Sequence, residues 1–518
     1  MKKKSPALRP SAAISVRPPN KVNIRQLPTG VKGLDEILGG GLPEFSFNLL
    51  VGTPGCGKTT LAHQFAFANA TSKRPALYFT VLGEPAIKML RYQQQYSFFD
   101  ETKLNDSIRF INLSAIVADY DMDAVLAEIT KQVDASNPGI VIVDSFRTVL
   151  WKTTHSGAPE TQLQSFTQRL AMLLTSARAT TFLIGEYSEF EIAGDPMFTV
   201  ADGLFCLSQV TERNAVVRKL QIIKLRGQAS VPGLHTVRIG SDGLQAFSRT
   251  LGLQHRESRP RSDYRLSTGI PILDQLLGGG IPRGDSVLIA GPSGTGKSVL
   301  ATQFIDAGIR KGESAIIAIF EERPEGYISR AASLGLNLKT AWKSGKLEVL
   351  YLRPLDLSVD ETMQEILDAV KRTGAKRLVI DSLAGFEMAL APGFRTDFRE
   401  SLYRMIGALT GAGVTIVSTV EIEDAFTSFP FSHYAISFLT DDIIRLRYVE
   451  IDGQLRKVMV IVKMRGGDHS KDIREYVIDG TGVVVISPRH TDYTRLTSGL
   501  PDRVGDRKES APEPKSLV

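Results

Sequence analysis

The sequence from Gly291 to Ser298 reads G-P-S-G-T-G-K-S and fits the P-loop pattern G-x-x-x-x-G-K-S/T. The apolar run Ser286–Ala290 before it is typical of a buried strand, and Val299–Ile309 after it has the pattern of a helix. In such a unit the glycines let successive backbone N–H groups face one hollow, and the helix start adds partial positive charge. The stretch therefore predicts a site for the phosphates of a nucleotide.

A second copy of this pattern lies nearer the N-terminus, where Gly52–Thr59 reads G-T-P-G-C-G-K-T. The flanking sequence repeats as well. The segment L-P-T-G-V-K-G-L-D-E-I-L-G-G-G-L-P begins at Leu27, and L-S-T-G-I-P-I-L-D-Q-L-L-G-G-G-I-P begins at Leu266. Lys58 and Lys297 are separated by the same 239 residues (297 − 58) as the other repeated positions. A gap-free repeat of this length indicates the duplication of a whole domain.

The residues expected to bind nucleotide belong to the two loops and to the first helical turn after each. The loop lysine can reach the β- and γ-phosphates, and the hydroxyl residue after it can hold Mg²⁺. In the N-terminal copy these residues are Gly52, Gly55, Cys56, Gly57, Lys58, Thr59 and Thr60. In the C-terminal copy they are Ser293, Gly294, Thr295, Gly296, Lys297, Ser298 and Val299.

Apolar, strand-like runs alternate with amphipathic, helix-like segments in both copies. The expected strands are 76–81, 139–144, 180–185 and 215–225 in the first copy, and 315–320, 377–381, 414–420 and 443–464 in the second. The expected helices are 124–133, 160–176, 362–371 and 396–410. This alternation predicts the α/β class, with a mainly parallel sheet and helices on both of its faces in each copy.

The bulk composition fits two globular domains. The 518 residues are 42% hydrophobic and 23% charged, and the net charge of +6 is only a weak indication of nucleic-acid binding. Polar and basic sequence predicts a disordered tail at 1–24, a linker at 249–264 and a closing loop with a tail at 491–518. The two domains are then 25–248 and 265–490.

Two distant cysteines, Cys56 and Cys206, form no zinc or disulfide pattern, which suits a reducing compartment. No apolar run reaches the roughly 18 residues of a membrane span, and no signal peptide is recognised. We therefore expect a cytoplasmic protein.

Carboxylates follow the strands where magnesium and the attacking group would lie. Asp144 and Asp381 end equivalent apolar runs and fit the acid next to the Mg²⁺ shell. Glu321 and Glu322 follow the strand 315–320, at the sheet edge where ligands bind in such folds. We expect them to position or deprotonate the nucleophile. The Mg²⁺ ligands are expected to be Thr59, Ser298, Glu321 and Asp381.

The first copy lacks the carboxylate pair. Leu82 and Gly83 stand opposite Glu321 and Glu322, while Glu84 lies opposite Arg323. A shift of one residue turns a strand side chain to the other face, so Glu84 is a doubtful substitute. We therefore expect the first copy to bind ATP and to turn it over slowly.

A basic motif also recurs, as Lys224-Leu225-Arg226 and Lys463-Met464-Arg465. A Lys and an Arg two residues apart on a strand point to the same side. At a subunit edge they would contact phosphates bound by a neighbour, and an arginine supplied in this way contributes roughly 10³–10⁵ to turnover. The alternative is an ordinary basic edge strand.

With these residues together, the chain resembles the KaiC family of circadian clock ATPases and autokinases over nearly all of residues 25–500. The shared features are the duplicated RecA-like domains, the paired P-loops and the Glu321–Glu322 pair. Further matching stretches are 446–451 (L-R-Y-V-E-I), 463–466 (K-M-R-G) with His469 and 473–475 (I-R-E), and 493–499 (Y-T-R-L-T-S-G). The resemblance implies two tandem RecA-like P-loop NTPase domains.

The resemblance also implies a homo-hexamer of two stacked rings, with ATP and Mg²⁺ bound between subunits. Lys224–Arg226, Lys463–Arg465 and His469 would then contact a neighbour's nucleotide. In the family the C-terminal ring phosphorylates a neighbouring Ser/Thr pair. Ser437 falls on the serine acceptor, whereas Phe438 falls on the threonine and cannot accept phosphate. One phosphorylation site is therefore expected.

Two departures indicate a divergent, KaiC-like signalling or circadian-type switch. The first is the Leu82–Gly83 pair. The second is the short C-terminal tail, because residues 502–518 show no amphipathic helix to recruit the family's KaiA activator. A KaiB-like partner remains compatible with the sequence.

Two functions of other classes stay open. A RecA-like DNA-dependent ATPase would show salt-sensitive DNA binding and DNA-stimulated turnover, although the sequence has no zinc ribbon and no recognisable helix-hairpin-helix. A nucleotide-gated scaffold would assemble with ATP and catalyse little, as the missing carboxylates of the first copy suggest. A eukaryotic-type kinase is disfavoured, since neither H-R-D nor D-F-G occurs.

Overall fold

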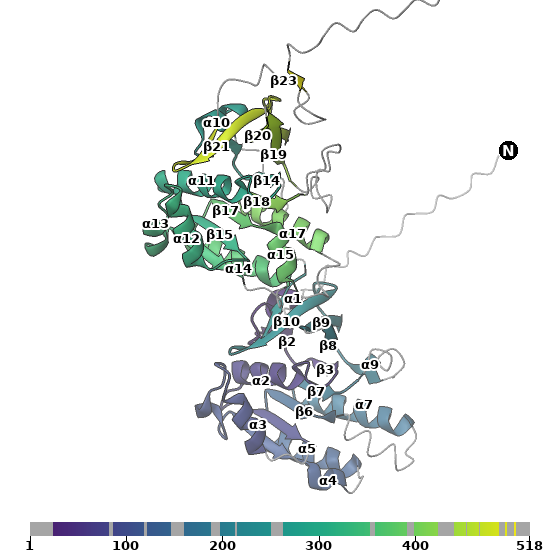
Figure 1. The fold of residues 1–518 in the computed structure, drawn as a ribbon. Helices are drawn as coiled ribbons and strands as arrows, with labels where there is room; N and C mark the ends of the chain where they lie inside the picture. The colour runs from purple at the N-terminus through teal and green to yellow at the C-terminus, as the bar shows by residue number, and fades with distance from the viewer. Residues whose placement is uncertain are drawn as a thin grey trace, which may run out of the picture.

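The computed structural model has two α/β domains joined in one chain (Figure 1). It describes residues 24–81, 86–118, 122–146, 160–187, 197–212, 215–249, 263–352, 358–390, 398–422, 440–451, 453–465, 467–485, 493–494 and 502–503. Among these residues, no helix is both long and apolar enough to cross a membrane.

Nine strands form the N-terminal sheet in the order β11-β10-β9-β8-β3-β7-β6-β4-β5. They are β3 (Phe47–Gly52), β4 (Ala76–Thr80), β5 (Ile108–Asn112), β6 (Ile140–Asp144), β7 (Thr180–Gly185), β8 (Gly203–Glu212), β9 (Ala215–Leu225), β10 (Leu234–Gly240) and β11 (Gly243–Phe247). The pairs among β3 to β8 are parallel, and β8 to β11 form an antiparallel extension.

The C-terminal sheet repeats this order as β22-β21-β20-β19-β14-β18-β17-β15-β16. Its strands are β14 (Ser286–Gly291), β15 (Ala315–Ile319), β16 (Leu347–Tyr351), β17 (Arg377–Asp381), β18 (Thr415–Glu421), β19 (Asp442–Ile451), β20 (Gln454–Met464), β21 (Arg474–Asp479) and β22 (Gly482–Val485). Short two-stranded sheets pair β1 (Gln26–Leu27) with β2 (Leu42–Pro43), β12 (Arg265–Leu266) with β13 (Ile281–Pro282), and β23 (Tyr493–Thr494) with β24 (Asp502–Arg503).

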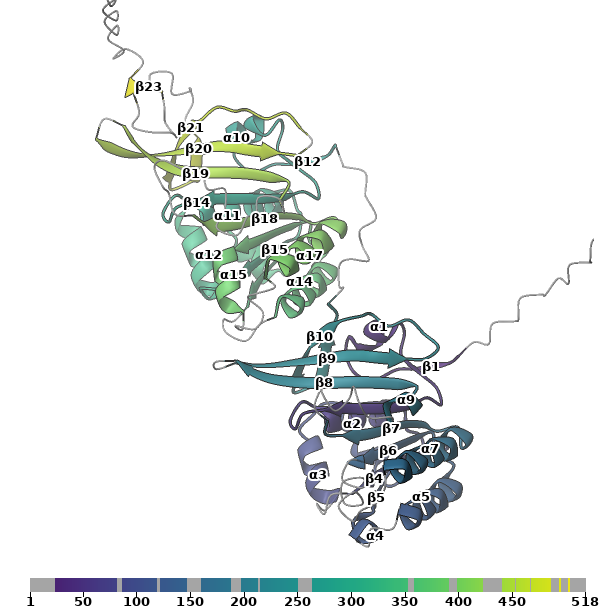
Figure 2. The same cartoon turned by 90° about the vertical axis from the view of Figure 1, so that its right-hand side faces the viewer.

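Helices cover both faces of each sheet (Figures 1 and 2). In the N-terminal domain they are α1 (Leu34–Leu38), α2 (Lys58–Asn69), α3 (Ala86–Gln93), α4 (Ser114–Ala118), α5 (Met122–Ser136), α7 (Glu160–Ser176), α9 (Met197–Val200) and the 3₁₀ turn η1 (Glu101–Lys103). In the C-terminal domain they are α10 (Pro271–Leu276), α11 (Lys297–Arg310), α12 (Pro324–Ser333), α13 (Lys339–Lys343), α14 (Val359–Thr373), α15 (Leu383–Ala389) and α17 (Phe398–Gly411). The α/β class expected from the sequence is confirmed.

Each sheet separates two hydrophobic cores. Leu49 and Val143 pack into one core of the N-terminal domain, whereas their neighbours Leu50 and Ile142 pack into the core on the opposite face. Alternate strand residues point to opposite faces, so a continuous apolar run is what a parallel strand buried on both sides requires. The C-terminal sheet divides its residues in the same way.

Some elements extend beyond their expected ends because the capping residue, rather than the apolar pattern, determines where a helix begins. Helix α14 starts three residues before the expected 362, where Ser358 Oγ accepts a hydrogen bond from the backbone N–H of Glu361 at 3.1 Å. It ends at Thr373 and is capped by Gly374, whose φ of 66° is the left-handed conformation that favours glycine. The expected tail at 1–24 lies almost wholly outside the described residues, as does most of 491–518.

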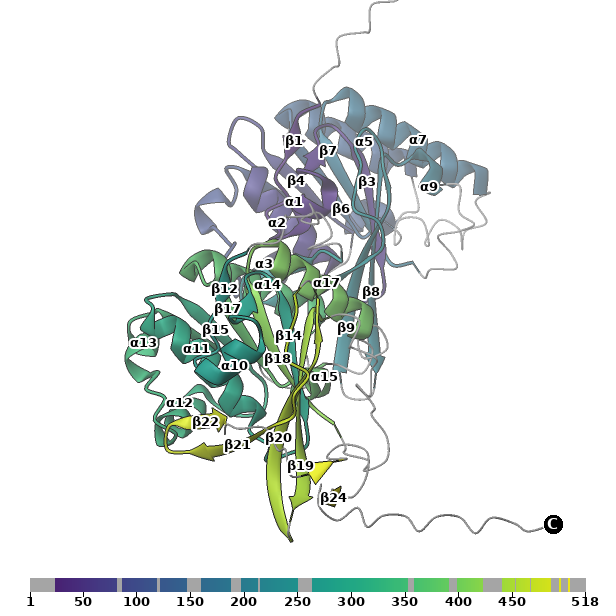
Figure 3. The same ribbon diagram turned by 90° about the horizontal axis from the view of Figure 1, so that it is seen from above.

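Helices α14 and α17 lie next to the N-terminal domain (Figures 1 and 3). Ion pairs from these two helices join the domains. Ion pairs connect Lys32 with Asp368 at 3.5 Å, Arg238 with Glu361 at 2.7 Å and Arg249 with Glu400 at 3.4 Å. The start of the expected linker is therefore part of a contact surface in the structure.

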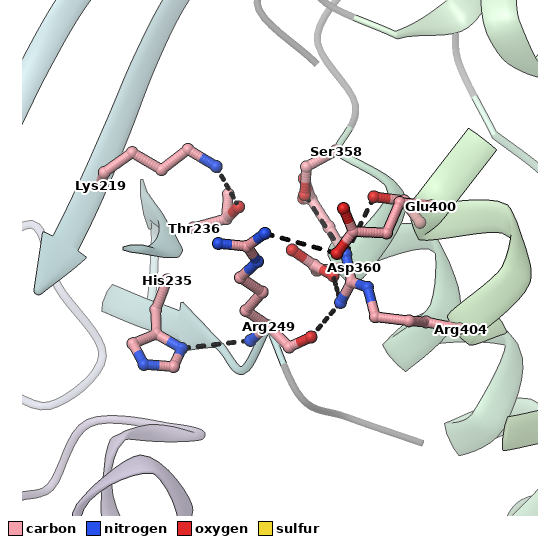
Figure 4. Close-up of polar contacts among 10 residues, drawn as sticks. Lys219, His235, Thr236, Arg249, Ser358, Asp360, Glu400 and Arg404 are labelled. Atoms are coloured by element: carbon pink, nitrogen blue, oxygen red, sulfur yellow. Dashed lines mark hydrogen bonds and ion pairs between the residues drawn. The ribbon is translucent and has the colours of Figure 1, made fainter. Parts of the chain in front are cut away.

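Figure 4 shows the centre of this contact. Arg404 on α17 forms a buried ion pair with Asp360 at 2.9 Å and also donates to the carbonyl oxygen of Arg249. The backbone N–H of Arg249 donates to His235 Nδ1 at 3.1 Å, and His235 Nε2 lies 2.9 Å from the carbonyl oxygen of Val231. The Arg249 backbone is thus bound through its N–H group by the N-terminal domain and through its carbonyl oxygen by the C-terminal domain.

Candidate nucleotide sites

Both P-loops connect a central strand to a helix. The N-terminal loop runs from β3 to α2, which begins at Lys58, and the C-terminal loop runs from β14 to α11, which begins at Lys297. Gly57 and Gly296 precede these helices with φ of 106° and 93°. A Cβ at Gly57 would lie 2.8 Å from Ile239 Cδ1, and one at Gly296 would lie 2.5 Å from Ile478 Cδ1. Positive φ and close packing therefore both require glycine here.

The two loop lysines fold back on their own loops. Lys58 Nζ donates to the carbonyl oxygens of Gly52 at 3.0 Å and Thr53 at 2.8 Å, and Lys297 Nζ donates to that of Pro292 at 2.8 Å. Burial lowers the pKa of Lys297, while the nearby carboxylates of Glu421, Asp381 and Glu321 oppose that shift. Phosphate oxygens would provide stronger, charged acceptors for the same ammonium groups.

The other expected loop residues lie around these lysines. Cys56, within the N-terminal loop, is buried, and burial raises the pKa of its thiol against the effect of Lys58. Thr60 and Thr295 are also buried. The remaining loop and first-turn residues that we expected are half-buried or exposed, apart from buried Gly52; these are Gly55, Thr59, Ser293, Gly294, Ser298 and Val299.

In the N-terminal site, Asp144 is at the end of β6 and faces the start of α2. Thr59 Oγ1 donates to Asp144 Oδ2 at 2.9 Å, and Tyr78 Oη donates to the same oxygen at 2.7 Å. Burial raises the pKa of Asp144, and these hydrogen bonds oppose the shift. The sequence predicted Thr59 and Asp144 as neighbours but gave no indication of Tyr78.

In the C-terminal site, Asp381 ends β17 and accepts a hydrogen bond from Thr419 Oγ1 at 2.6 Å through its Oδ1 atom. The next residue, Ser382, donates from Oγ to Glu321 Oε1 at 3.0 Å. Glu321 is therefore held beside Asp381. Glu322 instead forms an ion pair with Arg330 on α12, so the structure separates the two expected catalytic carboxylates.

The residues around both loops fit a magnesium–nucleotide complex. Among the described residues, no cluster of three or more His, Cys, Asp or Glu side chains can hold a metal ion by itself. Mg²⁺ in phosphate sites usually takes one or two protein ligands together with phosphate oxygens and waters. The Thr59–Asp144 contact in one domain and the grouping of Asp381 with Glu321 in the other suit that arrangement.

Comparisons with known proteins agree with this geometry. The family model described as "ATPase: KaiC" matches twice, over residues 27–250 and 266–490. The chain belongs to the KaiC family. It is 30% identical to the circadian clock oscillator protein KaiC of Picosynechococcus sp. over 498 residues, which cover 94% of each chain. It is likewise 30% identical to the circadian clock oscillator protein KaiC 1 of Synechocystis sp., over 94% of each chain.

The chain is a divergent KaiC-family member and a KaiC-like ATP-binding protein. In the first domain, Leu82 and Gly83 stand where the second domain has its carboxylate pair. These two residues and the doubtful substitute Glu84 lie outside the described residues. The expected phosphoacceptor Ser437 and its neighbour Phe438 also lie outside them.

The basic motifs of this KaiC-family chain lie at equivalent strand ends. Lys224 Nζ and Arg226 Nη2 both donate to the carbonyl oxygen of Thr199, at 3.0 and 3.4 Å, and Arg226 also pairs with Asp202 at 3.2 Å. The two side chains thus reach the same side of the strand. Burial and the adjacent arginine lower the pKa of Lys224.

The C-terminal motif has corresponding contacts within its own domain. Lys463 Nζ donates to the carbonyl oxygen of Thr440 at 2.5 Å, and Arg465 pairs with Asp441 at 3.4 Å. Met464 is buried and Leu225 is half-buried, so these two residues pack rather than project. The backbone N–H of His469 bonds to Asp468. Contact with a neighbour's nucleotide remains a prediction for both motifs.

Sequence reasoning missed three residues near the KaiC-type sites. Tyr78 and Thr419 contact the two aspartates, and Glu421 at the end of β18 acts on Lys297 electrostatically. The strand expected over 414–420 stopped one residue before Glu421. Glu421 pairs with Gly291 at the end of β14, and parallel strands end at the same sheet edge as the P-loop. This position would have indicated Glu421 as a site residue.

Proposed function

We propose that this KaiC-like protein hydrolyses ATP mainly in its C-terminal domain and transfers the γ-phosphate to Ser437 as a serine autokinase. One observation carries the proposal. Glu321 is held by Ser382 next to Asp381, and all three lie on the side of the sheet that carries Lys297. Such a carboxylate beside a P-loop has the position that a base for phosphoryl transfer needs.

Glu321 is the better placed base of the pair. It is exposed and accepts a hydrogen bond from the Ser382 hydroxyl, whereas the carboxylate of Glu322 is engaged in an ion pair with Arg330 on α12. In the proposed step, the Ser437 hydroxyl oxygen or a water oxygen bonds to the γ-phosphorus. The bond from that phosphorus to the β–γ bridging oxygen breaks, ADP leaves, and Glu321 takes the hydroxyl proton.

The C-terminal site holds the substrate through Lys297, Ser298 and Asp381. Bound Mg²⁺ would neutralise charge on the β- and γ-phosphates. We propose Ser298, Asp381 and Glu321 as its protein contacts here and Thr59 in the N-terminal domain. We also propose that Asp144 lies next to the coordination shell of the magnesium ion bound in the N-terminal domain. The P-loop residues of both domains would bind the phosphates.

The proposed assembly is a hexameric ring in the cytoplasm that acts as a signalling or circadian-type switch. The relatives are named as circadian clock oscillator proteins, and they match over almost the whole chain. In the ring, Lys224–Arg226, Lys463–Arg465 and His469 would approach the nucleotide of a neighbour. A KaiB-like partner is compatible with the proposal, whereas a KaiA-type activator is not expected.

The test uses full-length protein with Mg²⁺ and ATP labelled on the γ-phosphate. We expect label on the protein at Ser437, lost in Ser437→Ala and in Glu321→Gln, with Glu322→Gln as the matched control that keeps most of the label. Label released only as free phosphate would refute the autokinase and leave an ATPase. Absence of any turnover would support a nucleotide-gated scaffold, and turnover stimulated by DNA would support a DNA-dependent ATPase.

A further inference from the structure

Each nucleotide-site aspartate accepts a hydrogen bond from one neutral hydroxyl on a neighbouring strand. The donor strand lies on one side of the aspartate's strand in the N-terminal domain and on the other side in the C-terminal domain. In the N-terminal domain Tyr78 on β4 donates to Asp144 at 2.7 Å. In the C-terminal domain Thr419 on β18 donates to Asp381 at 2.6 Å. Strand β4 corresponds to β15 and strand β18 to β7, because the two sheets have the same order.

In each domain, the residue equivalent to the other domain's hydroxyl donor is apolar. Ile317 occupies the register of Tyr78, since both residues lie two positions before the strand partner of the aspartate. Ile184 on β7 is the partner of Asp144 itself and corresponds to Thr419. Both isoleucines are fully buried. Each of the duplicated domains therefore has one such donor, but the two donors come from strands that are not equivalent.

The Tyr78 ring is fixed by its surroundings. It is fully buried and lies edge-on to His63, with ring centroids 4.7 Å apart and an interplanar angle of 82°. Phe110 contacts it from β5, with a centroid distance of 5.3 Å. A phenol is an O–H donor at neutral pH, and an ionised Asp accepts only, so the direction of the hydrogen bond is determined.

We propose that Tyr78 is a positioning residue of the N-terminal nucleotide site. Its hydroxyl and that of Thr59 converge on Asp144 Oδ2 and hold the carboxylate in one orientation toward the magnesium–nucleotide complex. Thr419 has the same role for Asp381. The proposal rests on the nucleotide binding of the proposed function but on no step of its chemistry, so it stands or falls separately from the autokinase.

The test measures ADP binding to the full chain by calorimetry, with Mg²⁺ and with EDTA. A Lys297→Ala background removes most binding at the C-terminal loop, so that the N-terminal site is observed. We expect Tyr78→Phe to reduce the gain in affinity that Mg²⁺ provides by about tenfold, because a hydrogen bond to a charged group is lost. Affinity in EDTA should stay within about twofold, since the loop contacts are unchanged.

The exchange between domains supplies a rescue variant. Ile184→Thr added to Tyr78→Phe places the donor on the strand that the C-terminal domain uses, and should restore most of the Mg²⁺-dependent gain. An unchanged or increased gain in Tyr78→Phe would overturn the proposal, as would an equal loss with Mg²⁺ and EDTA. Failure of the rescue in folded protein would overturn it too.

The mirror variant covers the case in which Tyr78→Phe does not fold. In a Lys58→Ala background, Thr419→Val should lower the Mg²⁺-dependent gain at the C-terminal site by a similar factor, and a Thr415→Val control on the same strand should not. Thr415 lies at the start of β18, where its hydroxyl contacts the backbone N–H of Gly284. Equal effects of the two variants would contradict the proposal.

Discussion

Arg238 Nε on β10 lies 2.7 Å from Glu361 Oε1 on α14, so an ion pair joins the N-terminal sheet to the first turn of a C-terminal helix. The next residue, Ile239, packs on Gly57 at the start of α2. One short strand therefore contacts both the N-terminal P-loop and the C-terminal domain. Helix α14 in turn leads into β17, which ends in Asp381.

Substituting one or the other partner of this ion pair should change the free energy of unfolding by unequal amounts. The Glu361 side chain is 15% exposed and Arg238 is 44% exposed. Burial raises the pKa of Glu361, and Arg238 partly opposes the shift. Arg238→Met should destabilise the protein by about 1–2 kcal/mol at pH 7, because it leaves a buried carboxylate unpaired. Glu361→Gln should cost less, because water can solvate the freed arginine.

Acid should partly reverse the Arg238→Met effect. A carboxyl whose folded-state pKa is raised favours folding most when it is protonated, and its charge disfavours folding as the pH rises through the folded pKa. Denaturant unfolding at pH 7 and pH 5 measures this. Equal losses in Arg238→Met and Glu361→Gln at both values would contradict the expected asymmetry.

The buried Arg404–Asp360 pair lies within the C-terminal domain and holds Arg404 against the carbonyl oxygen of Arg249, so it should be the strongest ion pair at the domain junction. Both side chains are nearly inaccessible, at 7% and 9%. Asp360→Asn would leave the Arg404 charge without its partner and should cost about 3 kcal/mol in the free energy of unfolding. The matched control is Lys32→Ala, because the exposed Lys32 ammonium lies 3.5 Å from half-buried Asp368, and it should cost less than about 1 kcal/mol. Similar costs for both variants would show that burial does not set the strength of these contacts.

The sequence predicted the features that depend on local spacing. Glycines and lysines at fixed intervals identify the P-loops, and alternation of apolar runs identifies the two parallel sheets. Asp144 and Asp381 were predicted because each ends such a run. The sequence also identified the carboxylate pair, but not the separation of its two side chains. Arg330 contacts Glu322 from the next helix, whereas Ser382 contacts Glu321 from the residue after β17.

The missed residues depend on which strands lie side by side. Tyr78 and Asp144 are 66 residues apart in sequence and meet only because β4 pairs with β6. A buried tyrosine within an apolar run looks like core until its hydroxyl is given a partner. Thr419 and Asp381 meet in the same way across β17 and β18.

His63 should make the N-terminal domain sensitive to acid. It is fully buried beside Tyr78, and burial lowers its pKa from 6.5 to about 4 against the smaller, opposing effect of the Gln93 side chain. The unfolded chain then binds a proton more readily than the folded one. Stability is therefore complete above pH 6.5 and is lost as the pH falls from 6.5 toward 4.

The expected contribution of His63 is about 2 kcal/mol between pH 7.5 and pH 5, from 1.36 kcal/mol for each pKa unit. His63→Phe should remove that part of the pH dependence, whatever its effect on stability at pH 7.5. Denaturant unfolding of both proteins at the two pH values gives the difference. A variant as acid-sensitive as the wild type would show that His63 binds its proton equally well in both states.

The two P-loop lysines should differ in their effect on ATP turnover. Lys297 has Asp381, Glu321 and Glu421 around it, whereas the residues that replace the carboxylate pair in the first domain are Leu82 and Gly83. We therefore expect Lys297→Ala to lower the steady-state release of phosphate about tenfold or more. Lys58→Ala should leave most of the release, since the sequence of the domain it affects has Leu82 and Gly83 in place of the carboxylate pair. Light scattering on both variants checks that assembly is retained, so that a lost ring is not mistaken for lost chemistry. Equal losses in two equally assembled variants would mean that the first domain hydrolyses ATP as fast as the second, and that Glu84 or another group replaces the missing pair.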